Sequence, residues 1–252
     1  MKIIDSHVHL NDSRYDEDRD EVLNRIKNEM DFVVNIGYDY ESSKISVEYA
    51  DKYDFIYATV GLHPAEEEEY TQELEDKIRE LAKNKKVLAI GEIGLDYHWM
   101  TKTKEEQARI FRAQMKLAEE LNMPVVIHTR DAMEDTIKIL NEFPKVRGIL
   151  HCYPGSYQIA EKVVDRYYLG IGGVLTFKNA KKLVEVVEKI PIEHLVIETD
   201  CPYMTPTPHR GKRNEPVYTK FVAEKIAEIK NMSYQEVVDI TNENTRKAYN
   251  MI

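Results

Sequence analysis

Eight short apolar runs, each followed by a longer amphipathic stretch, constrain the fold of this 252-residue chain more than any other feature. The runs are rich in Val, Ile and aromatic residues, as buried parallel strands are. They span residues 2–9, 31–36, 54–60, 86–91, 124–128, 147–151, 167–171 and 194–200. Strands that alternate with helices in this way predict a (β/α)8 TIM barrel. A doubly wound open sheet stays open as the alternative, because periodicity does not prove that a sheet closes.

Helical patterns fill the stretches between the runs. Thr103 and Glu106 have the spacing of a capping box, and Ser233 with Glu236 predicts the start of the last helix. The acidic run 66–69 is interpreted as an exposed helix N-terminus, which the helix dipole would favour. No linker, low-complexity segment or repeat of fixed period is evident, so one barrel domain is expected over residues 1–252.

Composition narrows the cellular setting and the class of partner. No run of about 18 apolar residues occurs, so no membrane span is expected, and the N-terminus lacks the pattern of a signal peptide. The two cysteines, Cys152 and Cys201, are interpreted as buried free thiols, with a disulfide as the alternative. Together these features favour a cytoplasmic protein. The net charge of −10 argues against a broad basic surface for duplex DNA. It does not exclude a phosphate substrate held by metal ions and a few arginines. No obligate protein partner is evident.

Titratable residues gather at the carboxyl ends of the apolar runs, where barrel enzymes carry their chemistry. His7 and His9 stand two positions apart and share one face of a strand, and a divalent metal is the usual partner of such a pair. The predicted metal ligands are His7, His9, Glu92, His128, His151 and Asp200. These nitrogen and carboxylate ligands suit Zn, Mn, Ni, Co or Mg, and six of them favour two ions over one. Glu92 could instead satisfy backbone amides in a turn, and Asp200 could cap the next segment.

A second group of residues is placed to contact substrate. Its members are His63, Arg210, Lys212 and Arg213. The alternative role of His63 is to hold a loop in place. The alternative role of the basic residues, Arg210, Lys212 and Arg213, is to form a salt bridge with Glu215. Arg130 shows the same ambiguity, because it either contacts substrate or pairs with Asp131.

Seven motifs in order along the whole chain resemble the TatD family of metal-dependent hydrolases. They are Asp5-Ser6-His7-Val8-His9-Leu10, Gly61-Leu62-His63-Pro64, Gly91-Glu92-Ile93-Gly94-Leu95-Asp96-Tyr97, His128-Thr129-Arg130, His151-Cys152, Glu198-Thr199-Asp200-Cys201-Pro202-Tyr203 and Arg210-Gly211-Lys212-Arg213-Asn214-Glu215-Pro216. The resemblance implies a TIM barrel of the amidohydrolase-like group. It also implies a two-metal site and hydrolysis of phosphodiester bonds in DNA, often as an exonuclease.

Carried onto this sequence, the resemblance assigns each ligand a role. It implies that one metal is held by His7, His9 and Asp200, that the second is held by His128 and His151, and that Glu92 bridges them. Asp200 is also expected to accept a proton from the attacking water. Together with the bridging Glu92, Asp200 is therefore a predicted catalytic residue. Pro154 stands where many members of the family have serine, which puts a nearby phosphate contact in doubt.

Three other functions stay open at this point. One is a small-molecule amidohydrolase on the same barrel, and Glu92 weakens it by standing where such enzymes often carry a carbamylated lysine. Another is a deacylase of mischarged tRNA, which some relatives of the family resemble. The third is a metal-binding protein without catalytic activity.

Overall fold

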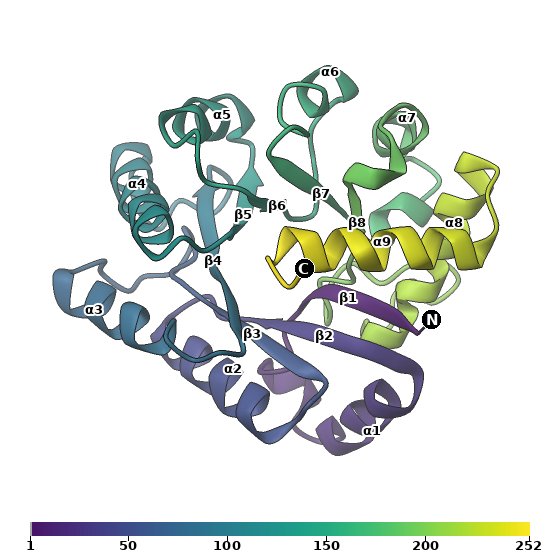
Figure 1. Ribbon diagram of the computed structural model, residues 1–252, viewed down its shortest axis with the longest axis horizontal. Coiled ribbons are helices and arrows are strands. Elements are labelled where there is room, and N and C mark those ends of the chain that lie inside the picture. Colours follow the sequence, from purple (N-terminus) through teal and green to yellow (C-terminus); the bar gives the residue numbers. More distant parts are fainter. Residues whose placement is uncertain (1) are drawn as a thin grey trace. The chain divides into compact units, whose positions relative to one another are not determined.

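The structure is a computed structural model that describes residues 2–252, and Figure 1 shows its strands alternating with helices along the chain. Its eight parallel strands and intervening helices have the order of a (β/α)8 barrel, as the sequence predicts. The residues pack into two compact units, which are described one at a time. The expectation of a single domain over residues 1–252 stays a prediction.

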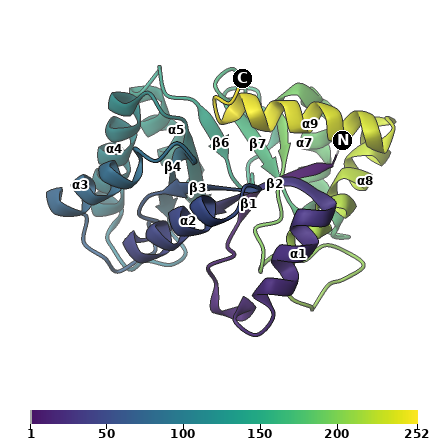
Figure 2. The same ribbon diagram turned by 60° about the horizontal axis from the view of Figure 1, so that its bottom comes forward.

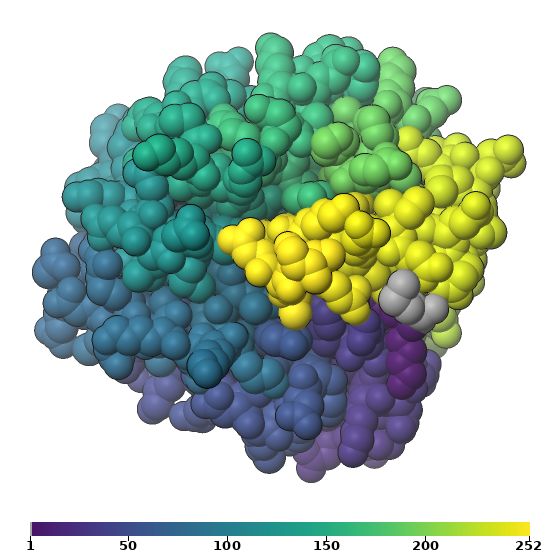
Figure 3. Space-filling view, viewed as in Figure 1, coloured from purple at the N-terminus to yellow at the C-terminus, as the bar shows by residue number. Residues whose placement is uncertain are grey.

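Of the described residues, unit 1 comprises 2–35, Cys152–Lys247 and Met251–Ile252. Within it β1 pairs with β2 and β7 pairs with β8, all in parallel. Its strands are β1 (Ile3–Val8), β2 (Met30–Ile36), β7 (Tyr167–Ile171) and β8 (Leu195–Ile197). Its helices are α1 (Arg19–Glu29), α6 (Tyr157–Ala160), α7 (Lys181–Lys189), α8 (Thr219–Lys230) and α9 (Tyr234–Ala248), with 3-10 turns at Ser13–Tyr15, Gly173–Thr176, Ile192–His194 and Pro216–Tyr218. Figure 3 shows α9, at the yellow end of the colour scale, on the molecular surface.

Unit 2 comprises Ile36–His151 and Ala248–Asn250. Its strands pair in sequence order, and all the pairs are parallel. They are β3 (Ile56–Val60), β4 (Val87–Asp96), β5 (Val125–Arg130) and β6 (Gly148–Leu150). The helices are α2 (Tyr40–Lys52), α3 (Gln72–Leu81), α4 (Lys104–Leu121) and α5 (Met133–Glu142). Helix α2 packs against β3 and α4 packs against β4, as Figures 1 and 2 show.

Five strands end at other residues than the sequence predicts, β1 and β6 one residue early and β4, β5 and β8 by two residues or more. Strand β4 continues to Asp96, well beyond the predicted end at Gly91, so Glu92 lies inside the strand. His128 likewise lies inside β5. Strand β8 ends at Ile197, so Asp200 belongs to the segment that follows it. In β4 and β5, pairing between the two strands continues past the predicted runs to Asp96 and Arg130, whereas β8 stops before the polar residues that end its predicted run.

The helix starts predicted at Thr103 and Ser233 are confirmed. The Thr103 hydroxyl accepts a hydrogen bond from the Glu106 backbone N–H at 3.2 Å, and α4 begins at Lys104, directly after Thr103. Ser233 and Glu236 form a reciprocal pair, with Ser233 Oγ accepting at 3.2 Å and Glu236 Oε2 accepting at 2.9 Å. Each bond satisfies an amide that the first helical turn leaves without a partner.

Two further expectations are tested by the fold. Cys152 and Cys201 are both free cysteines, as predicted, but only Cys201 is fully buried and Cys152 is partly exposed. Burial raises the pKa of the Cys201 thiol. Among the described residues, no helix is both long enough and apolar enough to cross a lipid bilayer.

Gly94 fixes the distance between β4 and β5. It has φ +146°, and a Cβ at this position would lie only 1.9 Å from the backbone oxygen of His128. Gly94 and His128 are partners in the strand register, so the missing side chain lets the two backbones pair at the ligand position.

We expect Gly94→Ala to lower the free energy of unfolding by about 3 kcal/mol or more, because the added methyl group pushes His128 away while the backbone is strained. Gly211→Ala is the matched control, because Gly211 also has positive φ (+83°) but a Cβ there meets nothing within 4 Å. That variant should lose about 1 kcal/mol. Denaturant unfolding of both variants gives the comparison, and equal losses would contradict the steric argument.

Candidate functional site

The first cluster of ligand-type side chains lies in unit 1 and joins His7, His9 and Asp200. The two imidazole Nε2 atoms are 3.2 Å apart, and Asp200 Oδ1 lies 3.3 Å from His9 Nε2 and 3.7 Å from His7 Nε2. The backbone sets this arrangement, because the Asp200 N–H donates to the His7 carbonyl at 3.0 Å and the His9 N–H donates to the Cys201 carbonyl at 2.9 Å. A ladder from β1 to the segment after β8 therefore holds the carboxylate beside the histidine pair.

The spacing of these three atoms fits a bound cation. Ligand atoms at about 2.0–2.1 Å from a tetrahedral zinc ion lie about 3.3 Å from one another. The three separations in the cluster, 3.2, 3.3 and 3.7 Å, are close to this value. The donor set is also suitable, since two imidazoles and one carboxylate are common ligands of divalent metals.

Asp200 has a left-handed backbone, with φ 55°, which is uncommon for a residue other than glycine. Its neighbour Thr199 is held in place from two sides. The carboxylate of Asp5 accepts from Thr199 N at 3.0 Å and from Thr199 Oγ1 at 2.5 Å, while Asn214 Nδ2 donates to the Thr199 carbonyl at 3.0 Å. Burial raises the pKa of Asp5 well above its usual range, against the opposing effect of these hydrogen bonds. The support around Thr199 maintains the backbone conformation of Asp200.

The second cluster lies in unit 2 and is centred on Glu92 Oε1. This oxygen lies 3.1 Å from His128 Nδ1 and 3.7 Å from the Nε2 atoms of both His63 and His151. Glu92 and His151 are buried, and His63 and His128 are partly exposed. Of the four residues, Glu92, His128 and His151 were predicted as metal ligands, and His63 was predicted to contact substrate.

Asp96 is a site residue that the ligand prediction missed. Its Oδ2 lies 2.9 Å from His128 Nε2, and its Oδ1 accepts from the backbone N–H groups of His98 and Trp99, both at 2.8 Å. An ionised carboxylate only accepts, so His128 Nε2–H donates to Asp96, and a metal ion beside Glu92 would then bind at His128 Nδ1. This is the arrangement in which a carboxylate orients a metal-binding histidine. The available signal was spacing, because Glu92 and Asp96 are four residues apart on one strand and share a face.

The hydrogen bonds of Asp96 also set its pKa. Burial alone would raise it, but the bonds from His128 and the two backbone amides outweigh burial and lower the pKa of Asp96 to about 2. For His128 burial lowers the pKa, and the hydrogen bonds to Asp96 and Glu92 more than reverse this and raise it. Asp96 therefore stays ionised at any pH at which the protein would be assayed.

His63 differs from His128 in the nitrogen that faces the cluster. Its Nδ1 accepts the backbone N–H of Ala65 at 3.1 Å, so the proton of the neutral ring lies on Nε2. Nε2 is the atom directed toward Glu92. With this tautomer His63 offers an N–H donor instead of a metal ligand, which suits contact with a substrate oxygen.

The three basic residues after Asp200 have different environments. Arg213 donates two hydrogen bonds of 2.6 Å to the Asp18 carboxylate and one of 3.2 Å to Glu215. It therefore forms the salt bridge to Glu215 that the sequence offered as the alternative to phosphate binding. Arg210 is exposed and lies over the Phe177 ring at 3.7 Å. Lys212 is exposed as well. Arg210 and Lys212 are thus better placed than Arg213 to meet a solvent-borne anion.

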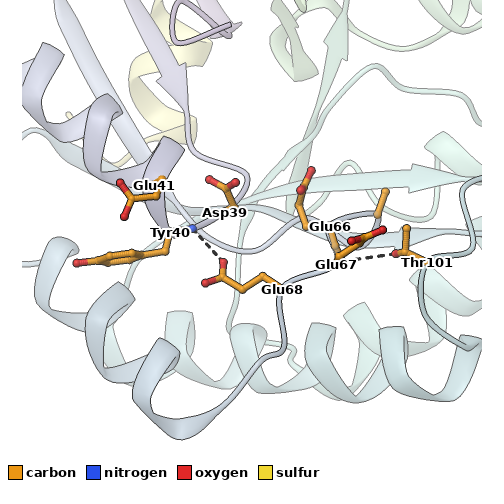
Figure 4. A pocket seen from close by; sticks show the side chains of 8 residues that line it. Asp39, Tyr40, Glu41, Glu66, Glu67, Glu68 and Thr101 are labelled. Atoms are coloured by element: carbon orange, nitrogen blue, oxygen red, sulfur yellow. Dashed lines mark hydrogen bonds between the residues drawn. The ribbon is translucent and has the colours of Figure 1, made fainter. Parts of the chain in front are cut away.

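A pocket in unit 2 is lined largely by carboxylates (Figure 4). Its lining residues are Asp39, Tyr40, Glu41, Ala65, Glu66, Glu67, Glu68 and Thr101. The interpretation of residues 66–69 as a helix N-terminus is wrong, because α3 begins only at Gln72, and Glu68 instead accepts the Tyr40 backbone N–H at 3.2 Å. The lining contains none of the predicted ligands, and its negative charge would repel a phosphate.

Comparison with known proteins identifies the family. Residues 4–250 match the sequence model described as "TatD related DNase". This chain is a member of the TatD family of metal-dependent hydrolases. It is 47% identical over 251 residues to the metal-dependent hydrolase YabD of Bacillus subtilis, with 98% of each chain covered. It is 35% identical over 264 residues to a Salmonella typhimurium relative named "3'-5' ssDNA/RNA exonuclease TatD", with 99% of this chain and 100% of the relative covered.

The fold prediction is confirmed by a solved TatD-family structure. The crystal structure of YJJV, a TatD homologue from Escherichia coli K12, superposes with a TM-score of 0.91 at 28% identity and 98% coverage of both chains. Family membership confirms the expected enzyme class of metal-dependent hydrolase. The two clusters supply candidate ligands for the metal on which such hydrolases depend.

We expect Asp96→Asn to weaken metal binding by the Glu92–His128 pair about 10–100-fold. The asparagine oxygen is needed by the amides of His98 and Trp99, so the NH2 group would face His128 and favour the tautomer that blocks Nδ1. Competition titration against a chromophoric chelator measures the affinity. Asp135→Asn is the control, because Asp135 is a carboxylate of the same unit that accepts from the Tyr97 hydroxyl and contacts neither cluster. Unchanged affinity in Asp96→Asn would show that Asp96 does not orient the ligand.

Proposed function

We propose that this TatD-family hydrolase cleaves phosphodiester bonds in nucleic acid with the help of two divalent metal ions, with DNA as the first substrate to test. The observation that carries the proposal is the pair of ligand clusters, each combining imidazoles with a carboxylate. The name of the Salmonella typhimurium relative supports the substrate class. A cytoplasmic location and the lack of an obligate protein partner belong to the same proposal.

Each unit contributes one set of ligands. His7, His9 and Asp200 would hold one ion, and Glu92, His128 and His151 would hold the other. The bridging role that the family resemblance implies for Glu92 stays a prediction. A bound divalent ion would lower the pKa of a coordinated water and neutralise charge on a phosphate oxygen.

The side chains of the chain supply proton transfer and orientation. Asp200 is the proposed general base, because its carboxylate can accept the proton of the attacking water. His63 presents an Nε2–H that can donate to an oxygen of the phosphate as its negative charge grows. Asp96 keeps the His128 ring in the tautomer that a metal ligand needs.

A small set of substrates separates this proposal from the remaining alternatives. Cleavage of end-labelled DNA or RNA, single-stranded or duplex, with added Mn²⁺ or Mg²⁺ supports the proposed function. Hydrolysis of cyclic amides alone would favour the small-molecule amidohydrolase, and release of amino acid from mischarged tRNA would favour the deacylase. Metal binding with no turnover of any substrate would leave only the non-catalytic alternative.

Asp200→Asn should reduce kcat on an oligonucleotide by about 10²-fold or more, the size of effect expected for loss of general base catalysis. Metal content must be measured on the same preparation, because Asp200 is also a proposed ligand. A variant that keeps its metal but loses its activity supports the base role. Near wild-type kcat would rule it out.

The basic loop provides a second test, which uses the difference between its members. We expect Arg210→Gln with Lys212→Gln to raise KM for an oligonucleotide while kcat changes little. On a single strand, the slope of log KM against log salt concentration should flatten by about 0.7 for each phosphate that the variant no longer binds. Steady-state kinetics across a salt series measures both effects. An unchanged KM and slope would remove these two residues from the substrate site.

Arg213→Gln is the matched variant and should act on stability instead. The hydrogen bonds that Arg213 donates lower the pKa of Asp18 in the folded state. The pair therefore stabilises the fold at pH values above the unfolded-state pKa of aspartate, about 3.9. The contribution is lost as pH falls through the lower folded-state pKa. We expect Tm to fall by about 2–4 °C at pH 7, with a smaller difference from wild type below pH 3. Thermal melts at the two pH values decide this, and a difference that grows in acid would contradict it.

A further inference from the structure

Trp99 is an exposed aromatic residue in the segment that follows β4. Its side chain is 59% exposed, and that of the adjacent Met100 is 47% exposed. Large apolar side chains in solvent are most informative where they stand together, because such patches mark binding surfaces. Trp99 follows Asp96 by three residues, and Asp96 is the buried carboxylate that orients the candidate ligand His128.

The backbone of this aromatic residue is fixed. Asp96 Oδ1 accepts the Trp99 N–H and the His98 N–H, each at 2.8 Å. The His98 ring packs against the Trp99 ring edge-to-face, with centroids 4.8 Å apart and an interplanar angle of 87°. One carboxylate therefore sets the positions of both the metal-ligand histidine and the tryptophan, and a partner stacked on this ring would be in a defined place relative to His128.

A cation accompanies the tryptophan. Arg130 ends β5, opposite Asp96 in the strand register, and its guanidinium carbon lies 5.9 Å from the centroid of the Trp99 ring. Arg130 is exposed and follows His128 by two residues. Asp131, the alternative partner weighed for Arg130, instead has a carboxylate oxygen 3.9 Å from His98 Nδ1. An aromatic face and an arginine beside a hydrolytic site are the two elements that single-strand binders combine, one for the base and one for the phosphate.

We propose that Trp99 is a stacking platform for an unpaired nucleobase and that Arg130 holds an adjoining phosphate. This inference rests on the proposed phosphodiesterase function and names two residues that would bind its substrate. A base inside a duplex is stacked on both faces by its neighbours, so only an unpaired or frayed base can stack on the ring. Stacking accepts every base, and the proposal therefore predicts little sequence preference.

The test compares two oligomers that differ only in their bases. One is a single-stranded thymidine oligomer, and the other is an abasic oligomer of the same length and charge. For the thymidine oligomer, Trp99→Ala should raise KM about 10–100-fold, Trp99→Phe should restore most of the loss, and kcat should change little. For the abasic oligomer, wild type and Trp99→Ala should have similar KM values. Tyr234→Ala is the control, since Tyr234 is an exposed aromatic residue, 39% exposed, outside both ligand clusters.

Fluorescence gives a readout that does not depend on turnover. Trp99 is the only tryptophan in the sequence, so all tryptophan emission reports on this position. Adding a phosphorothioate thymidine oligomer to the metal-loaded enzyme should quench the emission, and the abasic phosphorothioate should not. Equal quenching by both oligomers, or no quenching by either, would overturn the platform. So would an unchanged KM in Trp99→Ala.

Failure of the platform and failure of the proposed function give different results. If wild type cleaves the thymidine oligomer and Trp99→Ala does so with the same KM, the hydrolase proposal stands and the platform is wrong. If wild type cleaves neither oligomer but the thymidine oligomer alone quenches Trp99, the stacking site stands and the phosphodiesterase proposal is wrong.

Discussion

The cost of burying ionisable side chains governs how the strand ends of this protein are built. Imidazoles and carboxylates at these ends are removed from water, and each must find a partner of suitable charge and hydrogen-bonding character. In unit 1 the histidine pair faces Asp200, and in unit 2 three histidines face one oxygen of Glu92. A divalent cation would satisfy the same groups, and the separations among His7, His9 and Asp200 are close to those of a ligand shell.

The sequence predicts the parts of the site that depend on residue type and strand position. His7 and His9 could be paired because side chains two apart on a strand share a face, and the strand–helix alternation brought the other ligands to the same ends. Asp96 was missed because β4 continues beyond its apolar run, and the length of a paired strand depends on its neighbour. The partner of Arg213 was only half predicted. Glu215 is local and could be seen in the sequence, whereas Asp18 is 195 residues away and comes into contact only through folding.

Hydrogen bonds to the rings predict different roles for two histidines of one cluster. His63 and His128 both approach Glu92, but the first accepts a backbone amide on Nδ1 and the second meets a carboxylate at Nε2. The nitrogen directed toward Glu92 Oε1 is therefore Nε2 in His63 and Nδ1 in His128. The two side chains are chemically identical, so the sequence could separate the expected ligand His128 from the expected substrate contact His63 only by position and family resemblance. The surrounding hydrogen bonds assign the roles.

Asp96 accepts hydrogen bonds from three donors. Its Oδ2 accepts from His128, and its Oδ1 accepts from the backbone amides of His98 and Trp99. No other side chain of similar size offers acceptors in both directions at neutral pH. An evolving or engineered enzyme therefore cannot adjust the ligand and the following loop independently through this position. Variation in the loop must occur around a fixed aspartate, with the exposed side chains of residues 98–100 free to change while their backbone stays anchored. Contacts that these side chains make can then change without moving the backbone that Asp96 holds.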